Sequence, residues 1–114
     1  MKTPMNLKIL MKKTIVNSAR YLTIRILYPK PENTDDILGV VKKVSEAARK
    51  FEGLVEIGAW LDKENDRIVN ISLWESQEYA MKATKEMHPL FADVPWSQWE
   101  RRPAEYFLGL RRVV

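Results

Sequence analysis

Few side chains in this sequence have the type and spacing that chemistry requires. There is no cysteine, which excludes a thiol nucleophile, and the single histidine, His88, argues against a zinc site. Asn70 interrupts the apolar run at 68–74, although asparagine is depleted in strands. Trp74 follows four residues later, so both side chains would share one face of a strand. No clear acid–base pair accompanies them, so a packing role and a catalytic role both remain open.

The basic charge is concentrated at the N-terminus. The chain has 114 residues and a formal net charge of +4, but residues 1–20 hold five basic residues and no acidic one. We therefore interpret residues 1–19 as a basic extension that is dispensable for folding, although residues 12–16 could instead add an edge strand. Residues 20–114 form the folded domain. Their near-neutral charge disfavours a nucleic-acid partner, because such proteins cluster basic charge on the fold.

The apolar runs are short throughout the chain. None approaches the length of a membrane helix, and the N-terminus lacks the apolar stretch of a secretory signal. We expect no membrane partner. The absence of cysteine fits a reducing compartment, and we expect a cytoplasmic protein.

The periodicity predicts one α+β domain with the order strand, helix, strand, strand, helix, strand. Strands are expected near 21–28, 54–61, 67–74 and 104–111, and helices near 35–51 and 76–90. Ser76 is a suitable helix N-cap. Residues 92–103, with Trp96 and Trp99, are expected to form a loop that closes over the helix end or acts as a pocket lid. Two helices on one face of a four-stranded antiparallel sheet give a ferredoxin-like fold.

Alternation within the strands divides their residues into two sets. The apolar set is expected to face the helices: Leu22, Ile24, Ile26, Val69, Ile71 and Leu73. The opposite face would then be uncovered and would carry Thr23, Arg25, Glu56, Trp60, Asn70, Ser72 and Trp74.

Tryptophans on an open sheet favour burial against a second copy, so we expect a two-fold homodimer. Arg25 and Glu56 could form an ion pair on this face. A bulge near Ser72 would turn Trp74 toward the helices. The location of a pocket, within one subunit or inside the barrel, stays open.

Two segments resemble the antibiotic biosynthesis monooxygenase family of dimeric α/β barrels. They are FEGLVEIGAWLD at 51–62 and VNISLWESQEYAMKA at 69–83. That family typically has a third strand that ends in an aromatic residue, here the tryptophan of Trp-Glu-Ser. The helix that follows opens with an acid and an aromatic residue. The resemblance extends over about residues 20–113 and the order of elements agrees.

The resemblance implies a cofactor-independent monooxygenase that acts on a quinol-like or polyphenolic small molecule. In cofactor-free members an asparagine and a tryptophan on the third strand assist the oxidation, and Asn70 and Trp74 match them. Asn70 would donate to a phenolate or peroxide oxygen, Trp74 would stack on the ring, and Arg25 would stabilise the anion. The remaining candidates, for substrate binding, are Trp60, Tyr79, Ser72 and His88. No metal and no cofactor is expected.

Two alternatives remain. The haem-degrading branch of the family is a poorer match, because the first strand has no asparagine and His88 stands beside Pro89 near the helix end. The other alternative is a non-catalytic barrel that binds a small apolar ligand or only assembles.

Overall fold

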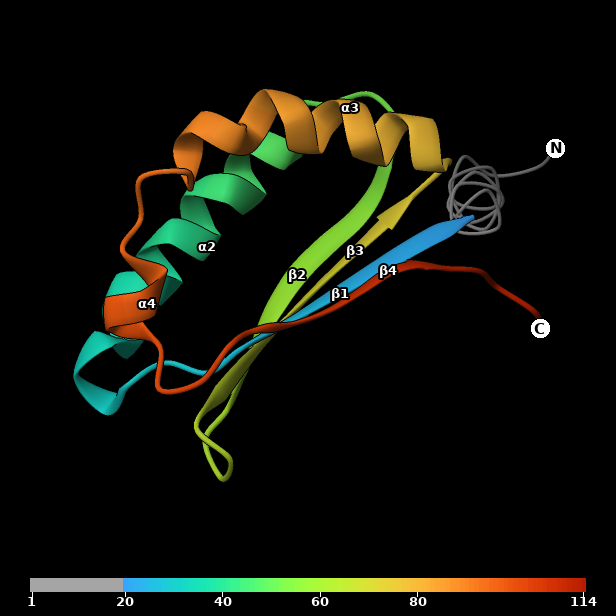
Figure 1. Ribbon diagram of the computed structural model, residues 1–114. Coiled ribbons are helices and arrows are strands. Elements are labelled where there is room, and N and C mark those ends of the chain that lie inside the picture. Colours follow the sequence, from blue (N-terminus) through green and yellow to red (C-terminus); the bar gives the residue numbers. More distant parts are fainter. Residues whose placement is uncertain (1–19) are drawn as a thin grey trace, which may run out of the picture.

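The strand and helix order agrees with the order expected from the sequence. The computed structural model describes residues 20–114; the predictions for residues 1–19 and for a strand at 12–16 lie outside that part. The main elements are β1 (Tyr21–Leu27), α2 (Thr34–Ala48), β2 (Leu54–Asp62), β3 (Arg67–Trp74), α3 (Gln77–Met87) and β4 (Glu105–Leu110) (Figure 1). Three short helical segments complete the domain, η1 (Pro31–Asn33), η2 (His88–Leu90) and α4 (Trp96–Trp99).

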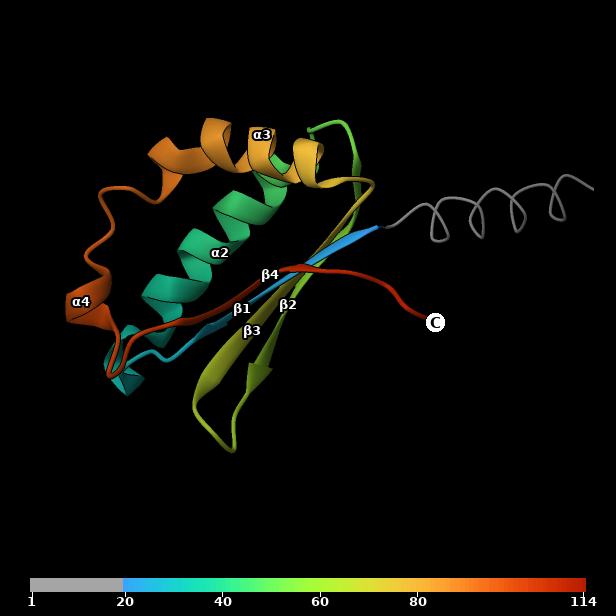
Figure 2. The same ribbon diagram turned by 45° about the vertical axis from the view of Figure 1, so that its right-hand side comes forward.

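The four strands form one antiparallel sheet in the order β2-β3-β1-β4. Both long helices lie on the same face of this sheet, and the other face has no helix over it in the described part of the chain (Figures 1 and 2). This is the predicted ferredoxin-like α+β fold. None of the helices that the structure describes is long and apolar enough to cross a membrane.

The expected N-cap serine and helix-ending proline are both found at the ends of α3, and the structure adds one short helix. Ser76 caps α3, since its hydroxyl accepts a hydrogen bond from the Tyr79 backbone N–H at 3.3 Å. Pro89 follows the end of α3 and lies in η2. The segment expected to be a loop contains the helical turn α4, whose Trp96 and Trp99 pack against the core.

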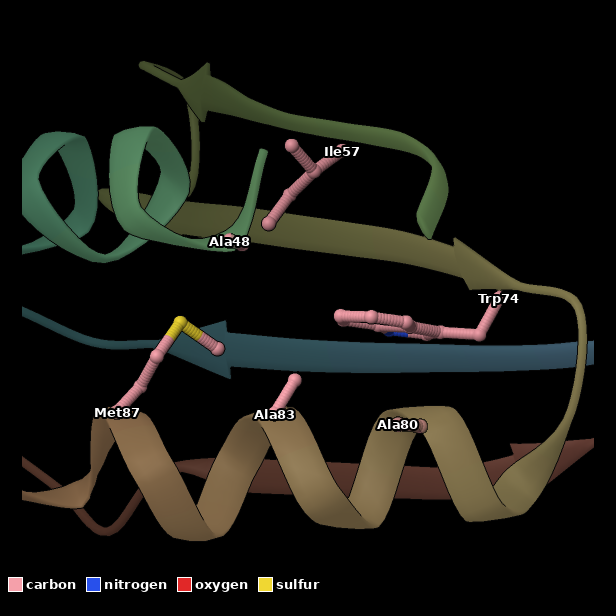
Figure 3. Packing of buried hydrophobic residues seen from close by; sticks show 6 residues of the cluster. All are labelled: Ala48, Ile57, Trp74, Ala80, Ala83 and Met87. Atoms are coloured by element: carbon pink, nitrogen blue, oxygen red, sulfur yellow. The ribbon is translucent and has the colours of Figure 1, made fainter. Parts of the chain in front are cut away.

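Two clusters of buried residues join the helices to the sheet. The first lies under α3 and contains Ala48, Ile57, Trp74, Ala80, Ala83 and Met87 (Figure 3). The second lies under α2 and contains Leu27, Ile37, Val41 and Ile68. Burial of these side chains against one sheet face supplies the main driving force for the fold.

The predicted assignment of faces is wrong for β1 and β3. Trp74 is only 3% exposed and packs against α3, and Leu27 and Ile68 pack against α2. By alternation, Thr23, Arg25, Asn70 and Ser72 also face the helices. The uncovered face therefore carries the apolar set Leu22, Ile24, Ile26, Val69, Ile71 and Leu73.

The reason is that strand alternation identifies which residues share a face, but not which face meets the helices. The prediction placed the more apolar set inward, whereas the helix-facing set here includes four polar residues that line a cavity, Thr23, Arg25, Asn70 and Ser72. β1 and β3 pair in one continuous register, and the register shift nearest Ser72 lies in β2, between Leu54 and Glu56, so a bulge in β3 is not what turns Trp74 toward the helices. In β2 the assignment is confirmed: Ile57 is buried toward the helices, and Trp60 is 57% exposed on the other face.

Candidate functional site

A cavity of about 480 Å³ lies between the sheet and α3, within one subunit. Its floor is formed by the helix-facing side chains of β1 and β3, which include Thr23, Arg25, Asn70, Ser72 and Trp74. Met81, Lys85 and Met87 of α3 form one wall, and Phe91, Trp96, Tyr106 and Leu108 contribute the rest of the rim. The volume is typical of a pocket for a small molecule.

The Trp74 indole ring lies between the sheet and α3. Figure 3 shows the ring extending along the sheet, with Ala83 and Met87 of α3 pointing toward the same layer. Its Nε1–H donates a hydrogen bond to the Ser72 hydroxyl at 3.0 Å. The Ser72 hydroxyl also forms a hydrogen bond with the Thr23 hydroxyl across the β1–β3 pair.

Asn70 and Arg25 are directly opposite each other on β3 and β1. The Asn70 Nδ2 group donates to the Gly58 carbonyl at 3.1 Å. This bond uses one of its two N–H donors, and within residues 20–114 the second donor and the amide oxygen have no partner and could bind a ligand. Asn70 is therefore held by the neighbouring strand while it lines the cavity.

Arg25 is a half-buried cation between two aromatic rings. Its guanidinium carbon lies 5.7 Å from the Phe91 ring centre and 5.5 Å from that of Tyr106. Within residues 20–114 it has no ion pair or hydrogen bond. The possible Arg25–Glu56 pair is wrong, because Glu56 pairs with Leu73 on the other sheet face. The donors of Arg25 are thus available to an anion.

The electrostatics of the cavity favour an anionic ligand. Arg25 and Lys85 line it, and none of its described lining residues is acidic. Glu100 lies close enough to be affected by Arg25: burial raises the pKa of Glu100, and the Tyr28 backbone N–H and Arg25 partly oppose that rise. Residues 20–114 hold no group of three histidine or acidic side chains that could bind a metal ion.

Three of the sequence candidates lie outside the cavity lining. Trp60 covers Gly58 on the uncovered sheet face. Tyr79 packs on Gly53 and donates to Glu52 at 3.5 Å, and the charge of Glu52 raises the pKa of Tyr79. His88 is exposed and makes an edge contact with the Phe91 ring, with 5.4 Å between the ring centres. The structure brings together the other four, Asn70, Trp74, Arg25 and Ser72.

Several lining residues were not among the sequence candidates. Thr23 was placed on the sheet but was given no role, and Phe91, Lys85 and Tyr106 were not considered. One signal was present for Tyr106, which is aromatic on the fourth strand and pairs with Arg25 in the sheet. Phe91 carried no such signal, because it follows η2 in an irregular segment.

The chain has a ferredoxin-like α+β fold with a cavity between the sheet and α3. No protein-family model matches the sequence, and no curated protein matches it either. Solved structures do match. Rv0793 from Mycobacterium tuberculosis superposes with a TM-score of 0.74 at 12% identity, covering 84% of this chain and 97% of that one.

Two further structures with this fold carry the name monooxygenase. A putative antibiotic biosynthesis monooxygenase from Nitrosomonas europaea has a TM-score of 0.69 at 15% identity, over 79% of this chain and 88% of that chain. A monooxygenase from the gene ActVA-Orf6 of Streptomyces coelicolor, solved with the ligand nanaomycin D, has a TM-score of 0.62 at 14% identity. It covers 86% of this chain and 93% of that chain. At these identities the likeness establishes the fold, and the function must be argued from the site.

Proposed function

We propose that this chain is a cofactor-independent monooxygenase that oxidises a quinol-like or polyphenolic small molecule in the cavity beneath α3. The observation that carries the proposal is that Asn70, Trp74 and Arg25 line the same cavity, and that Arg25 forms no ion pair within residues 20–114. These three groups were selected from the sequence for one chemistry. The structural match to a monooxygenase solved with nanaomycin D supports the same class of ligand.

The reaction needs little from the protein, because the substrate is itself the reductant. A phenol loses its proton to solvent, and the electron-rich ring of the phenolate forms a carbon–oxygen bond with O2. The resulting hydroperoxide loses water. The net change for a naphthol is naphthol plus O2 giving naphthoquinone plus water, with one oxygen atom in the product and one in water.

Each cavity residue then has a defined part. Arg25 and the free N–H of Asn70 stabilise the negative charge on the phenolate and on the peroxide that forms from it. The Trp74 indole borders the cavity and would contact the aromatic ring of the substrate through the small part of it that is exposed. The partly enclosed, mostly apolar cavity separates the reactive anion from bulk water.

We also propose that two copies pair through the uncovered sheet face. That face is apolar along β1 and β3, and Trp60, Phe107 and Leu110 are exposed, at 57%, 43% and 41%. Contiguous apolar surface of this kind favours association, and two-fold pairing is the commonest form. The catalytic cavities would lie on the outer side of each sheet, under the helices.

A second candidate is a non-catalytic ligand-binding barrel. It is favoured by one observation, namely that the described lining of the cavity contains no carboxylate or histidine that could act as a general base. Such a protein would bind the same anionic aromatic molecules without turnover.

Oxygen uptake against a panel of quinols and dihydroxynaphthalenes distinguishes the two candidates. We expect chelator-treated protein to consume oxygen faster than the protein-free solution with at least one substrate. Asn70→Ala should lower that rate about 100-fold, the size typical for loss of one oxyanion donor. Its melting temperature serves as the folding control. Uptake equal to the protein-free rate across the panel would leave only the binding protein.

A further inference from the structure

A chain of three hydrogen-bonded side chains crosses the cavity floor. The Trp74 Nε1–H is bonded to the Ser72 hydroxyl at 3.0 Å, and the Ser72 hydroxyl is bonded to that of Thr23. Ser72 is buried and Thr23 is half-buried, and the two stand directly opposite each other on β3 and β1. All three side chains line the cavity.

The chemistry of the donors fixes the direction of this chain. An indole N–H can only donate, so the Ser72 oxygen must accept from Trp74. The Ser72 proton then needs an acceptor, and Thr23 is its only other side-chain partner in residues 20–114. Because a buried hydroxyl proton left unpaired is costly, Ser72 donates to Thr23.

Thr23 is therefore the last member of this hydrogen-bonded series, and its own hydroxyl proton is not donated to any described residue. Its oxygen accepts from Ser72, and no other hydrogen bond of its side chain is present among the described residues. The Trp74 N–H, in contrast, is already committed to Ser72 and is not available to a ligand. The Thr23 hydroxyl therefore offers a hydrogen-bond donor to the same cavity that Arg25 lines.

We infer that Thr23 is a specificity-determining donor that binds the deprotonated oxygen of the phenolic substrate, and that Ser72 is a positioning residue that orients it. This inference deepens the proposed function, since it rests on the phenolate as substrate, but it does not depend on reaction with oxygen. Successive hydrogen bonds polarise one another, so a Thr23 proton supported by Ser72 and Trp74 is a stronger donor than an isolated hydroxyl. Donation to an anion is stronger than donation to a neutral oxygen.

The test measures the pKa of bound 2-naphthol from the absorbance of the naphtholate form. Thr23 should lower that pKa relative to free 2-naphthol by favouring the anion. Thr23→Val keeps the shape of the side chain and removes the proton, and the bound pKa should rise by about 1 to 2 units, the equivalent of one hydrogen bond to a charged group. Thr23→Ser should restore the lower pKa. The matched control is Thr34→Val, at the start of α2 and outside the cavity lining, which should leave the bound pKa unchanged.

A second variant tests the role of Ser72. Ser72→Ala should raise the bound pKa in the same direction as Thr23→Val but by less, because Thr23 keeps its proton and loses only its orientation. In the Thr23→Val background, Ser72→Ala should cause no further shift, since the two residues act through one donor. A general packing defect would instead give independent effects, and that result would overturn the relay.

The outcomes separate this inference from the proposed function. Equal bound pKa values for the unmodified protein and Thr23→Val, or no binding of 2-naphthol, would overturn the inference, even if oxygen uptake with other phenols stood. A shifted pKa without oxygen uptake would retain the inference and reject the enzyme.

Discussion

Among the cavity residues, the surroundings of Arg25 most clearly favour binding of an anionic ligand. A half-buried guanidinium is costly unless its donors are satisfied, and here the described neighbours that contact it are the rings of Phe91 and Tyr106. The aromatic contacts hold the side chain in place without neutralising its charge. We therefore propose that Arg25 is preorganised to bind an anion.

Replacement of Arg25 by methionine should weaken the binding of 2-naphtholate about tenfold, the equivalent of one charge-assisted hydrogen bond of about 1.5 kcal/mol. Methionine keeps most of the apolar stem and leaves no ion-pair partner stranded among the described residues. Calorimetric titration measures the change. Arg49→Met, the same substitution at the exposed end of α2, is the control and should bind as the unmodified protein does. Equal affinity for both variants would contradict a role for Arg25 in anion binding.

At the residue scale, the sequence predicted part of the cavity lining, and the reasons can be named. Asn70 was recognisable because asparagine is out of place in an apolar strand, and Trp74 because it shares that face. Tyr79 was expected at the site, but it points to Gly53 because it lies in the first turn of α3, beside the start of β2. Thr23 could not be selected, since its significance comes from a hydrogen bond to a strand 49 residues away.

Among the elements, β1 and β3 show what strand alternation can and cannot determine. It correctly grouped Thr23 with Arg25 and Asn70 with Trp74, and in β2 it correctly separated Ile57 from Trp60. It could not assign the groups to faces. In the structure the β1 residues from Tyr21 to Ile26 are half-buried on both faces, so neither group stands out as the buried one. A sheet with a ligand cavity on one face and an apolar surface on the other gives the reverse of the usual hydrophobic pattern.

The connection from α2 to β2 depends on Gly53. Its φ of +88° is unfavourable for other residues, and a Cβ there would meet the Tyr79 Cγ at 2.2 Å. Gly53→Ala should lower the free energy of unfolding by about 2 kcal/mol or more. Gly39→Ala provides the contrast, because Gly39 lies within α2 and an added methyl group there would meet no atom within 4 Å.

For Gly39→Ala we expect a gain of about 0.5 to 1 kcal/mol from better helix propensity. Urea denaturation of both variants measures the two effects side by side. Similar changes in stability at the two glycines would show that the contact between Gly53 and Tyr79 does not constrain this turn.

For the whole molecule, the uncovered sheet face is the surface through which we expect assembly. Ile71 lies at the middle of that face, paired with Ile24 on one side and Gly58 on the other. Ile71→Arg should convert the expected dimer to a monomer, because an arginine at the middle of an apolar interface would bury its charge without a partner. Sedimentation equilibrium in dilute solution gives the mass directly.

The control for this experiment is Leu90→Arg, which adds the same charge at an exposed apolar residue of η2. That variant should remain a dimer. A monomeric unmodified protein, or an Ile71→Arg variant that stays dimeric, would show that the apolar sheet face is not the interface.

We propose that one atom of O2 enters a phenolic ring bound in this cavity, and isotope labelling tests this transfer most directly. Chelator-treated protein is incubated under 18O2 with each quinol or dihydroxynaphthalene of the panel, and the products are analysed by mass spectrometry. We expect a product that carries one 18O atom, formed faster than in the protein-free reaction, with the second 18O atom in water. Products that form only at the protein-free rate, or whose new oxygen atom comes from solvent water, would contradict the claim.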